Sequence, residues 1–89
     1  MLINLGPRLD SAAAEGLKDE ICAKADQDLV IECSQVEQLG GLCLEVLMIA
    51  ASLRHRNGKS VQFEAPSAQM IDDLGRFGLT TDSLLEIAK

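Results

Sequence analysis

Short apolar runs typical of β-strands alternate with longer stretches of helical spacing, and this alternation restricts the fold more than any other feature. The runs predict strands over residues 1–5, 29–33 and 60–64. Apolar residues at steps of three and four predict helices over residues 11–25, 40–57 and 68–77, with a last short helix opened by residues 80–82. The order β-α-β-α-β-α-α implies one small α/β domain over residues 1–89, with a mostly parallel sheet flanked by helices.

Polar and glycine residues mark the predicted ends of these helices. Asp10 or Ser11 suits the N-cap of the first helix, and Glu15 is placed to complete a capping box with Ser11. Ser67 suits the N-cap of the third helix. Gly58 is placed to end the second helix in the left-handed conformation.

The second helix is unusually apolar for a chain of 89 residues. One stripe consists of Leu44, Leu47, Met48 and Ala51, and a second set widens it: Leu42, Val46, Ile49 and Leu53. We expect this helix to be largely buried. In the third helix the expected buried side consists of Met70, Ile71, Leu74 and Phe77. Such an apolar second helix is either fully covered within the domain or offers a face to a second copy, as in a homodimer.

The charge of the chain limits its partners. The formal net charge is −6, and Arg54, His55 and Arg56 are the only cluster of basic residues. Nucleic acids and anionic membranes require a basic face, so we expect no nucleic-acid partner. No apolar run is long enough to cross a bilayer, so membrane insertion is not expected.

Three cysteines indicate the compartment. Cys22, Cys33 and Cys43 each lie inside an apolar run, and their spacing matches no zinc-binding pattern. We expect buried thiols in a reducing environment, with no metal and no cofactor. Since the N-terminus also lacks a signal peptide, the predicted location is the cytoplasm.

The residues that carry most enzyme chemistry do not converge in this sequence. The only histidine, His55, lies near a helix end, where its charge complements the helix dipole. The carboxylate pairs at residues 19–20 and 72–73 are helical neighbours that point about 100° apart, which suits solvated faces. We therefore expect no catalytic residues. Gly40 and Gly41 match no phosphate-binding fingerprint, but free N–H groups at that helix start leave a small-anion sensor as an alternative.

Three segments carry a family resemblance. Residues 6–14 contain a Gly-x-x-Leu-Asp motif directly before the first predicted helix. Residues 29–39 contain an apolar strand followed by a Cys-Ser-x-Val step. Residues 58–67 and 74–79 form a third crossover that ends in a Gly-Leu pair. Taken in order, they resemble the STAS domain, the fold of bacterial anti-sigma-factor antagonists. The N-terminal strand that family members often add is expected to be missing or shortened here.

The sequence departs from the family at the turn before the second helix. Antagonists of this family carry Asp-Ser-Ser/Thr-Gly there, and a kinase phosphorylates the first Ser or Thr. The matching positions are Gly40, Gly41, Leu42 and Cys43. Because Gly41 falls at the phosphoacceptor and has no hydroxyl, phosphorylation at the family position is not expected. Ser34, just after the second strand, is the remaining candidate for phosphorylation.

The resemblance implies a non-catalytic protein-interaction module of bacterial signal transduction. Its expected partner is a regulatory kinase of the anti-sigma or chemotaxis type, bound through the loop and N-terminus of the second helix. The expected partner-binding residues are Ser34, Glu37, Gln38, Gly40, Gly41 and Leu42. The family also supplies small subunits of lipid-transport ABC complexes, and in that alternative the partner is an ATPase subunit.

Overall fold

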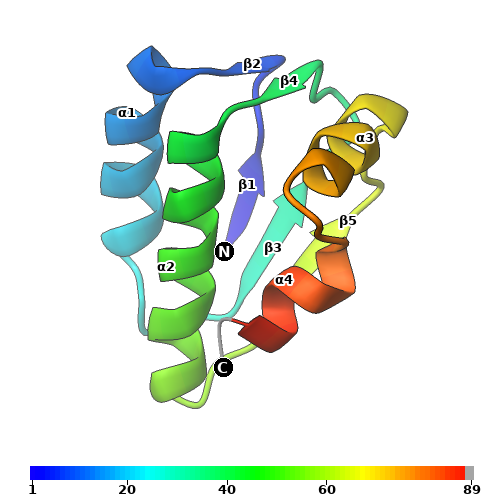
Figure 1. Cartoon of the computed structure of the whole chain (residues 1–89). Coiled ribbons are helices and arrows are strands. Elements are labelled where there is room, and N and C mark those ends of the chain that lie inside the picture. The colour runs from blue at the N-terminus through cyan, green and yellow to red at the C-terminus, as the bar shows by residue number, and fades with distance from the viewer. Residues whose placement is uncertain (88–89) are drawn as a thin grey trace.

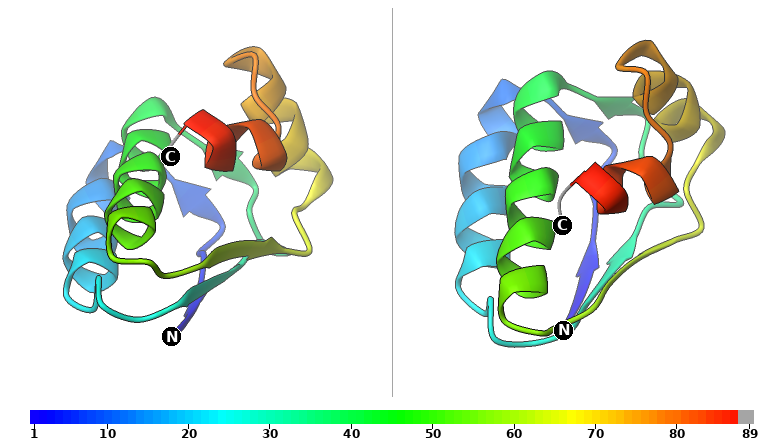
Figure 2. Two further views of the ribbon diagram at one scale, coloured as in Figure 1. Left: turned by 90° about the horizontal axis from the view of Figure 1, so that it is seen from below. Right: turned by 60° about the horizontal axis from the view of Figure 1, so that its bottom comes forward.

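The computed structural model describes residues 1–87 and arranges them in two layers, a sheet and helices on one of its faces (Figures 1 and 2). The parallel sheet has the order β1-β3-β5 and consists of β1 (Leu2–Asn4), β3 (Leu29–Glu32) and β5 (Val61–Glu64). The helices are α1 (Ser11–Cys22), α2 (Gly41–Arg56), α3 (Ala68–Arg76) and α4 (Thr81–Ile87). The predicted α/β fold, with a mostly parallel sheet and flanking helices, is confirmed.

A second, smaller ladder was not predicted. Strands β2 (Arg8–Leu9) and β4 (Gln38–Leu39) pair in parallel and lie across the top of the molecule in Figure 1. Two residues are too few to show the alternation by which a strand is recognised, so the sequence indicated only loops here. Leu9 and Leu39 face each other in this ladder, and both are buried.

The first helix begins as predicted and ends earlier. Asp10 is the N-cap, and its side chain accepts a hydrogen bond from the N–H of Ala13. The expected capping box of Ser11 with Glu15 is wrong, because Ser11 is already the first helical residue. The helix ends at Cys22, three residues before the predicted end.

The signals for the ends of the other helices are confirmed. The Ser67 side chain caps α3 by accepting from the N–H of Met70. Gly58 follows α2 with φ 71°, a left-handed conformation that glycine adopts without steric cost.

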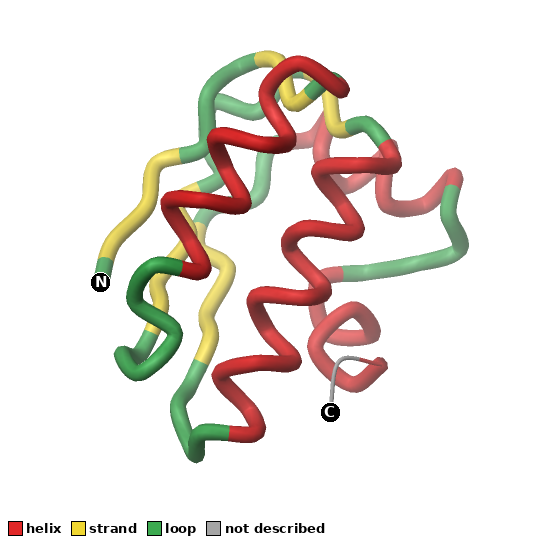
Figure 3. Tube along the Cα trace, turned by 90° about the vertical axis from the view of Figure 1, so that its left-hand side faces the viewer, coloured by secondary structure: helices red, strands yellow, loops and turns green. Residues whose placement is uncertain are grey.

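The core lies between the sheet and the helices α1 and α2, which run side by side (Figure 3). Ile3 and Ile31 point into it from the sheet, and Leu17, Ile21 and Leu47 meet them from the helices. This aliphatic layer positions the start of α2, where the candidate site lies.

The opposite face of the sheet is open. The near-continuous apolar run of residues 29–33 is typical of a strand covered on both faces, but Val30 and Glu32 are only partly buried. Leu2 on the neighbouring strand is 63% exposed. Among the described residues, the helices pack on the other side, as Figure 2 shows. The apolar run of β3 therefore does not indicate cover on both faces here.

Arg54 is a buried cation that caps α1 from the neighbouring helix. Its side chain is fully buried, and its guanidinium donates to the carbonyl oxygens of Ile21 at 2.8 Å, Lys24 at 3.1 Å and Gln27 at 3.0 Å. These carbonyls lie at and just after the C-terminal end of α1, where the helix dipole is negative. In the sequence Arg54 stands in a basic cluster with His55 and Arg56, but the structure buries Arg54 and leaves these two neighbours exposed.

Candidate protein-interaction site

The candidate site is the corner where β4 ends and α2 begins, defined here as residues 39–42. Gly40 is the N-cap of α2 and has an extended backbone, with φ −88° and ψ 165°. In the described structure no side chain caps this end of the helix. The corner therefore presents main-chain atoms and small residues at the start of α2.

The two glycines of the corner have different roles. A Cβ atom on Gly40 would lie 3.0 Å from the carbonyl oxygen of Leu9, so a side chain there would push against β2. The N–H of Gly40 donates to that same oxygen at 2.8 Å. Gly41 is exposed, and a Cβ there would meet only the ring edge of Phe77 at 3.9 Å. Gly40 thus permits the close approach of β2, whereas Gly41 leaves the surface open.

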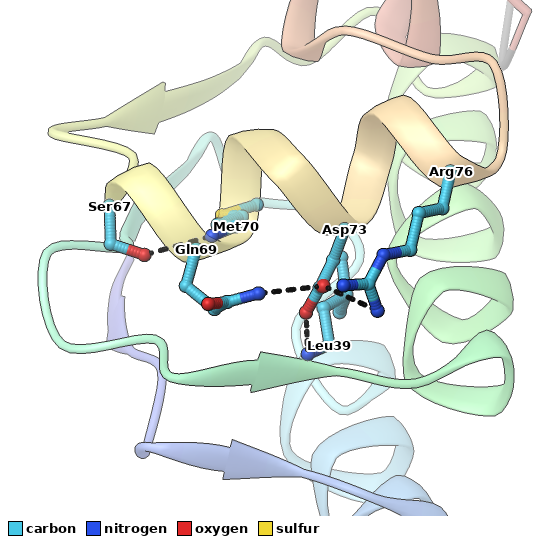
Figure 4. Close-up of polar contacts among 6 residues, drawn as sticks. All are labelled: Leu39, Ser67, Gln69, Met70, Asp73 and Arg76. Atoms are coloured by element: carbon cyan, nitrogen blue, oxygen red, sulfur yellow. Dashed lines mark hydrogen bonds and ion pairs between the residues drawn. The ribbon is translucent and has the colours of Figure 1, made fainter.

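A carboxylate on α3 holds the corner in place (Figure 4). Asp73 is 5% exposed, and its Oδ2 accepts from the backbone N–H of Leu39 at 2.8 Å. Its Oδ1 accepts from Gln69 at 3.0 Å and lies 3.6 Å from the Arg76 guanidinium. The pKa of Asp73 lies below its ordinary value, mainly because Leu39 donates a hydrogen bond to the carboxylate. The hydrogen bond from Gln69 and the positive charge of Arg76 lower it further. The expectation that residues 72–73 form a solvated pair is wrong for Asp73.

Two further contacts fix the corner to its surroundings. The hydroxyl of Ser67 donates to the carbonyl oxygen of Val36, in the loop before β4. The thiol of Cys43 lies 3.3 Å from the carbonyl oxygen of Asp10, which joins the first turn of α2 to the start of α1. Burial raises the pKa of Cys43, so this thiol is a packed donor and not a reactive thiolate.

Three exposed apolar side chains form a patch that begins at Gly41, and we define it by Leu42, which follows Gly41 in α2, Phe77, whose ring lies 3.9 Å from the Cβ position of Gly41, and Ile49, about two turns further along α2. These side chains are 53%, 49% and 40% exposed, so the prediction that they are buried is wrong. The reason at α3 is that Asp73 takes a place on the buried side, beside Met70 and Leu74. This orientation also exposes Ile71. Exposed apolar side chains that lie close together, as Leu42 and Phe77 do at Gly41, mark interaction surfaces.

The structure places most of the predicted partner-binding residues together. Gly40, Gly41 and Leu42 form the corner, and Gln38 is exposed on the adjoining strand. Glu37 is exposed just before it, and its N–H donates to the carbonyl oxygen of Pro7 at 2.7 Å.

Ser34 lies in a different place. It lines a cavity of about 310 Å³ at the carboxyl ends of β1 and β3, together with Asn4, Leu5, Glu32 and Gln35. Sequence reasoning missed Phe77 and Asp73 as parts of the site. The exposure of Phe77 could have been inferred from its position directly before Gly78, because the helix has ended by that point. The sequence contains no signal for the burial of Asp73.

Within residues 1–87, no group of three or more His, Cys, Asp or Glu side chains is placed to hold a metal ion. In the same range, none of the helices has the length and apolar character needed to cross a membrane. Burial raises the pKa of Cys33 to about 12, which leaves that thiol protonated and unreactive.

Comparison with protein-family models gives one match. Residues 1–86 fit the family described as "Mlab, STAS domain". No curated protein and no solved structure matches the chain significantly.

Proposed function

Because this chain belongs to the STAS domain family, we propose that it is a non-catalytic protein-interaction module of bacterial signalling. Domains of this family typically mediate contacts between proteins and generally have no catalytic activity. The three free cysteines favour a reducing compartment, and we therefore assign the module to the cytoplasm.

The observation that supports this proposal most is the exposed apolar patch around Gly41. Leu42 and Phe77 offer two large exposed apolar side chains next to Gly41, which is itself exposed and has no side chain to obstruct a partner. Hot spots of protein interfaces have this character, an apolar anchor point ringed by polar residues. Glu37 and Gln38 supply part of such a polar rim.

The corner is also held rigidly, which favours binding. Asp73 fixes the N–H of Leu39, and the β2–β4 ladder fixes Gly40. A surface that is already ordered loses little conformational entropy when a partner binds. The net charge of −6 favours a partner whose contact surface is basic.

The partner that we propose is a regulatory kinase of the anti-sigma or chemotaxis type. Gly41 occupies the position of the phosphorylated residue in the family's antagonists and offers no hydroxyl. Binding would then be constitutive, or controlled on the side of the kinase. The same glycine favours a second candidate, the ATPase subunit of a lipid-transport ABC complex, because such a partner needs no phosphoacceptor.

Affinity purification from native extract tests the proposal, followed by measurement of Kd with the purified partner. We expect a kinase to co-purify, and we expect Gly41→Arg to weaken its binding at least about 30-fold, as at an interface hot spot. Gly16→Arg is the matched control, since Gly16 is exposed on α1 with no atom within 4 Å of its Cβ position. Co-purification of an ATPase subunit would favour the second candidate. Equal binding by both variants would reject the corner as the docking site.

A further inference from the structure

The open face of the sheet is a second feature that calls for a partner. Parallel sheets are almost always covered on both faces, but here the described helices cover only one (Figure 2). The strand register arranges the outward side chains in two rows. One row consists of Leu2, Val30 and Gln62, and the other of Asn4, Glu32 and Glu64.

The charges of this face are not balanced within it. Glu32 and Glu64 are directly paired on adjacent strands, so two acidic side chains are neighbours on the outward face. The six outward residues of the strands include no basic side chain. A cationic group placed over this row would therefore be attracted by both carboxylates.

A cavity lies at the same end of the sheet, and polar atoms line it. Its volume is about 310 Å³, which is the small end of the range for pockets that hold ligands. Four of the residues that line it, Asn4, Glu32, Ser34 and Gln35, have side-chain oxygen atoms of a kind that accepts hydrogen bonds. Glu32 accepts from the N–H of Ser34 at 2.8 Å through one carboxylate oxygen, and the second oxygen can accept from a bound donor. A guanidinium group supplies several donors in one plane and suits such a set of acceptors.

We propose that the open face of the sheet binds a basic amphipathic helix of a partner protein, with an arginine in the cavity that Glu32 lines and a second basic side chain over Glu64, the neighbour of Glu32 on β5. The apolar side of that helix lies over Leu2 and Val30. This surface is separate from the corner and adds a second contact to the proposed function. A second copy of the chain does not suit the face, because it would bring further carboxylates to these ones. Anionic membranes are disfavoured for the same reason.

The test is a titration of the labelled chain, followed by amide NMR, with two synthetic amphipathic helical peptides of equal length. Both have leucine on one face, and the other face holds arginine in one peptide and glutamate in the second. We expect the arginine peptide to shift the amides of β1 and β3 and of residues 34–35, and the glutamate peptide to shift none of them. Anionic lipid vesicles form a third arm, and binding of the face to vesicles would overturn the proposal.

Two matched pairs of substitutions make the test specific. Glu32→Gln with Glu64→Gln should weaken the arginine peptide about fivefold or more, while Gln still accepts the Ser34 hydrogen bond. Glu15→Gln with Glu20→Gln makes the same change of charge on exposed positions of α1 and should alter the affinity by less than about twofold. Equal weakening by both pairs, or amide shifts confined to other surfaces, would overturn the proposal.

The single variant Glu64→Gln provides an independent reading. It removes one of two like charges that face each other, so its Tm should rise by about 1–4 °C. The same variant should bind the arginine peptide more weakly. A fall in Tm would contradict the electrostatic argument for this face.

Discussion

Asp73→Ala should loosen the corner, because this carboxylate joins α3 to β4. The substitution removes a hydrogen bond of 2.8 Å from the N–H of Leu39 to a buried charged acceptor. Hydrogen bonds to charged groups contribute about 1.5–3 kcal/mol, and the N–H left behind is buried without a partner. The contacts to Gln69 and Arg76 add at most about 1 kcal/mol, because Arg76 is exposed. We therefore expect the free energy of unfolding to fall by about 2–4 kcal/mol.

Urea denaturation measures this loss, and the neighbouring residue provides the control. Asp72 is exposed, and Asp72→Ala should change the free energy of unfolding by less than about 0.5 kcal/mol. Hydrogen exchange adds a local reading, since the amide of Leu39 should lose protection in Asp73→Ala and keep it in Asp72→Ala. Similar losses of stability in the two variants would refute the argument that Asp73 holds the corner.

Three further outcomes follow from the same contacts. Arg54→Met should lower the free energy of unfolding by about 3–5 kcal/mol in thermal or urea denaturation, because three carbonyls at the end of α1 lose their donor. Arg56→Met, on the exposed side of α2, should change this free energy by less than about 0.5 kcal/mol. Equal losses in the two variants would contradict the capping role of Arg54. Gly40→Ala should destabilise the chain by about 1–3 kcal/mol, because the new Cβ would lie 3.0 Å from the carbonyl oxygen of Leu9 in β2. Gly41→Ala should be neutral or slightly stabilising. The reverse order of stabilities would contradict the description of the corner. The pKa of Asp73 is lowered in the folded state, so this carboxylate stabilises the fold above the ordinary aspartate pKa, and the stabilisation disappears as pH falls through the lowered pKa. The free energies of unfolding of wild type and Asp73→Ala should therefore converge in acid. A difference that stays constant down to the lowered pKa would contradict the role assigned to Asp73.

The order of helices and strands was predictable because it follows from local patterns. The apolar runs that became β1, β3 and β5 and the periodic stretches that became the helices appear directly in the sequence. Capping by Asp10 and Ser67 depends on only a few neighbouring residues and was equally accessible. Such features require no knowledge of how the elements pack.

The features that could not be predicted depend on contacts between distant residues. Arg54 is an ordinary basic residue in the sequence, and its burial follows only once α1 ends beside α2. Asp73 is similar, because its partner Leu39 lies 34 residues earlier in the chain. Leu42 and Phe77 have the hydrophobicity of core residues, and their exposure is decided by how α2 and α3 are rotated against the sheet.

Amide NMR of the labelled chain bound to its purified partner tests the central claim most directly. The account predicts that the largest changes in amide chemical shift fall on residues 39–42 and on Phe77. In Gly41→Arg these changes should disappear, while the spectrum of the variant alone remains that of a folded protein. Changes that leave residues 39–42 and Phe77 untouched while the partner binds fully would contradict it.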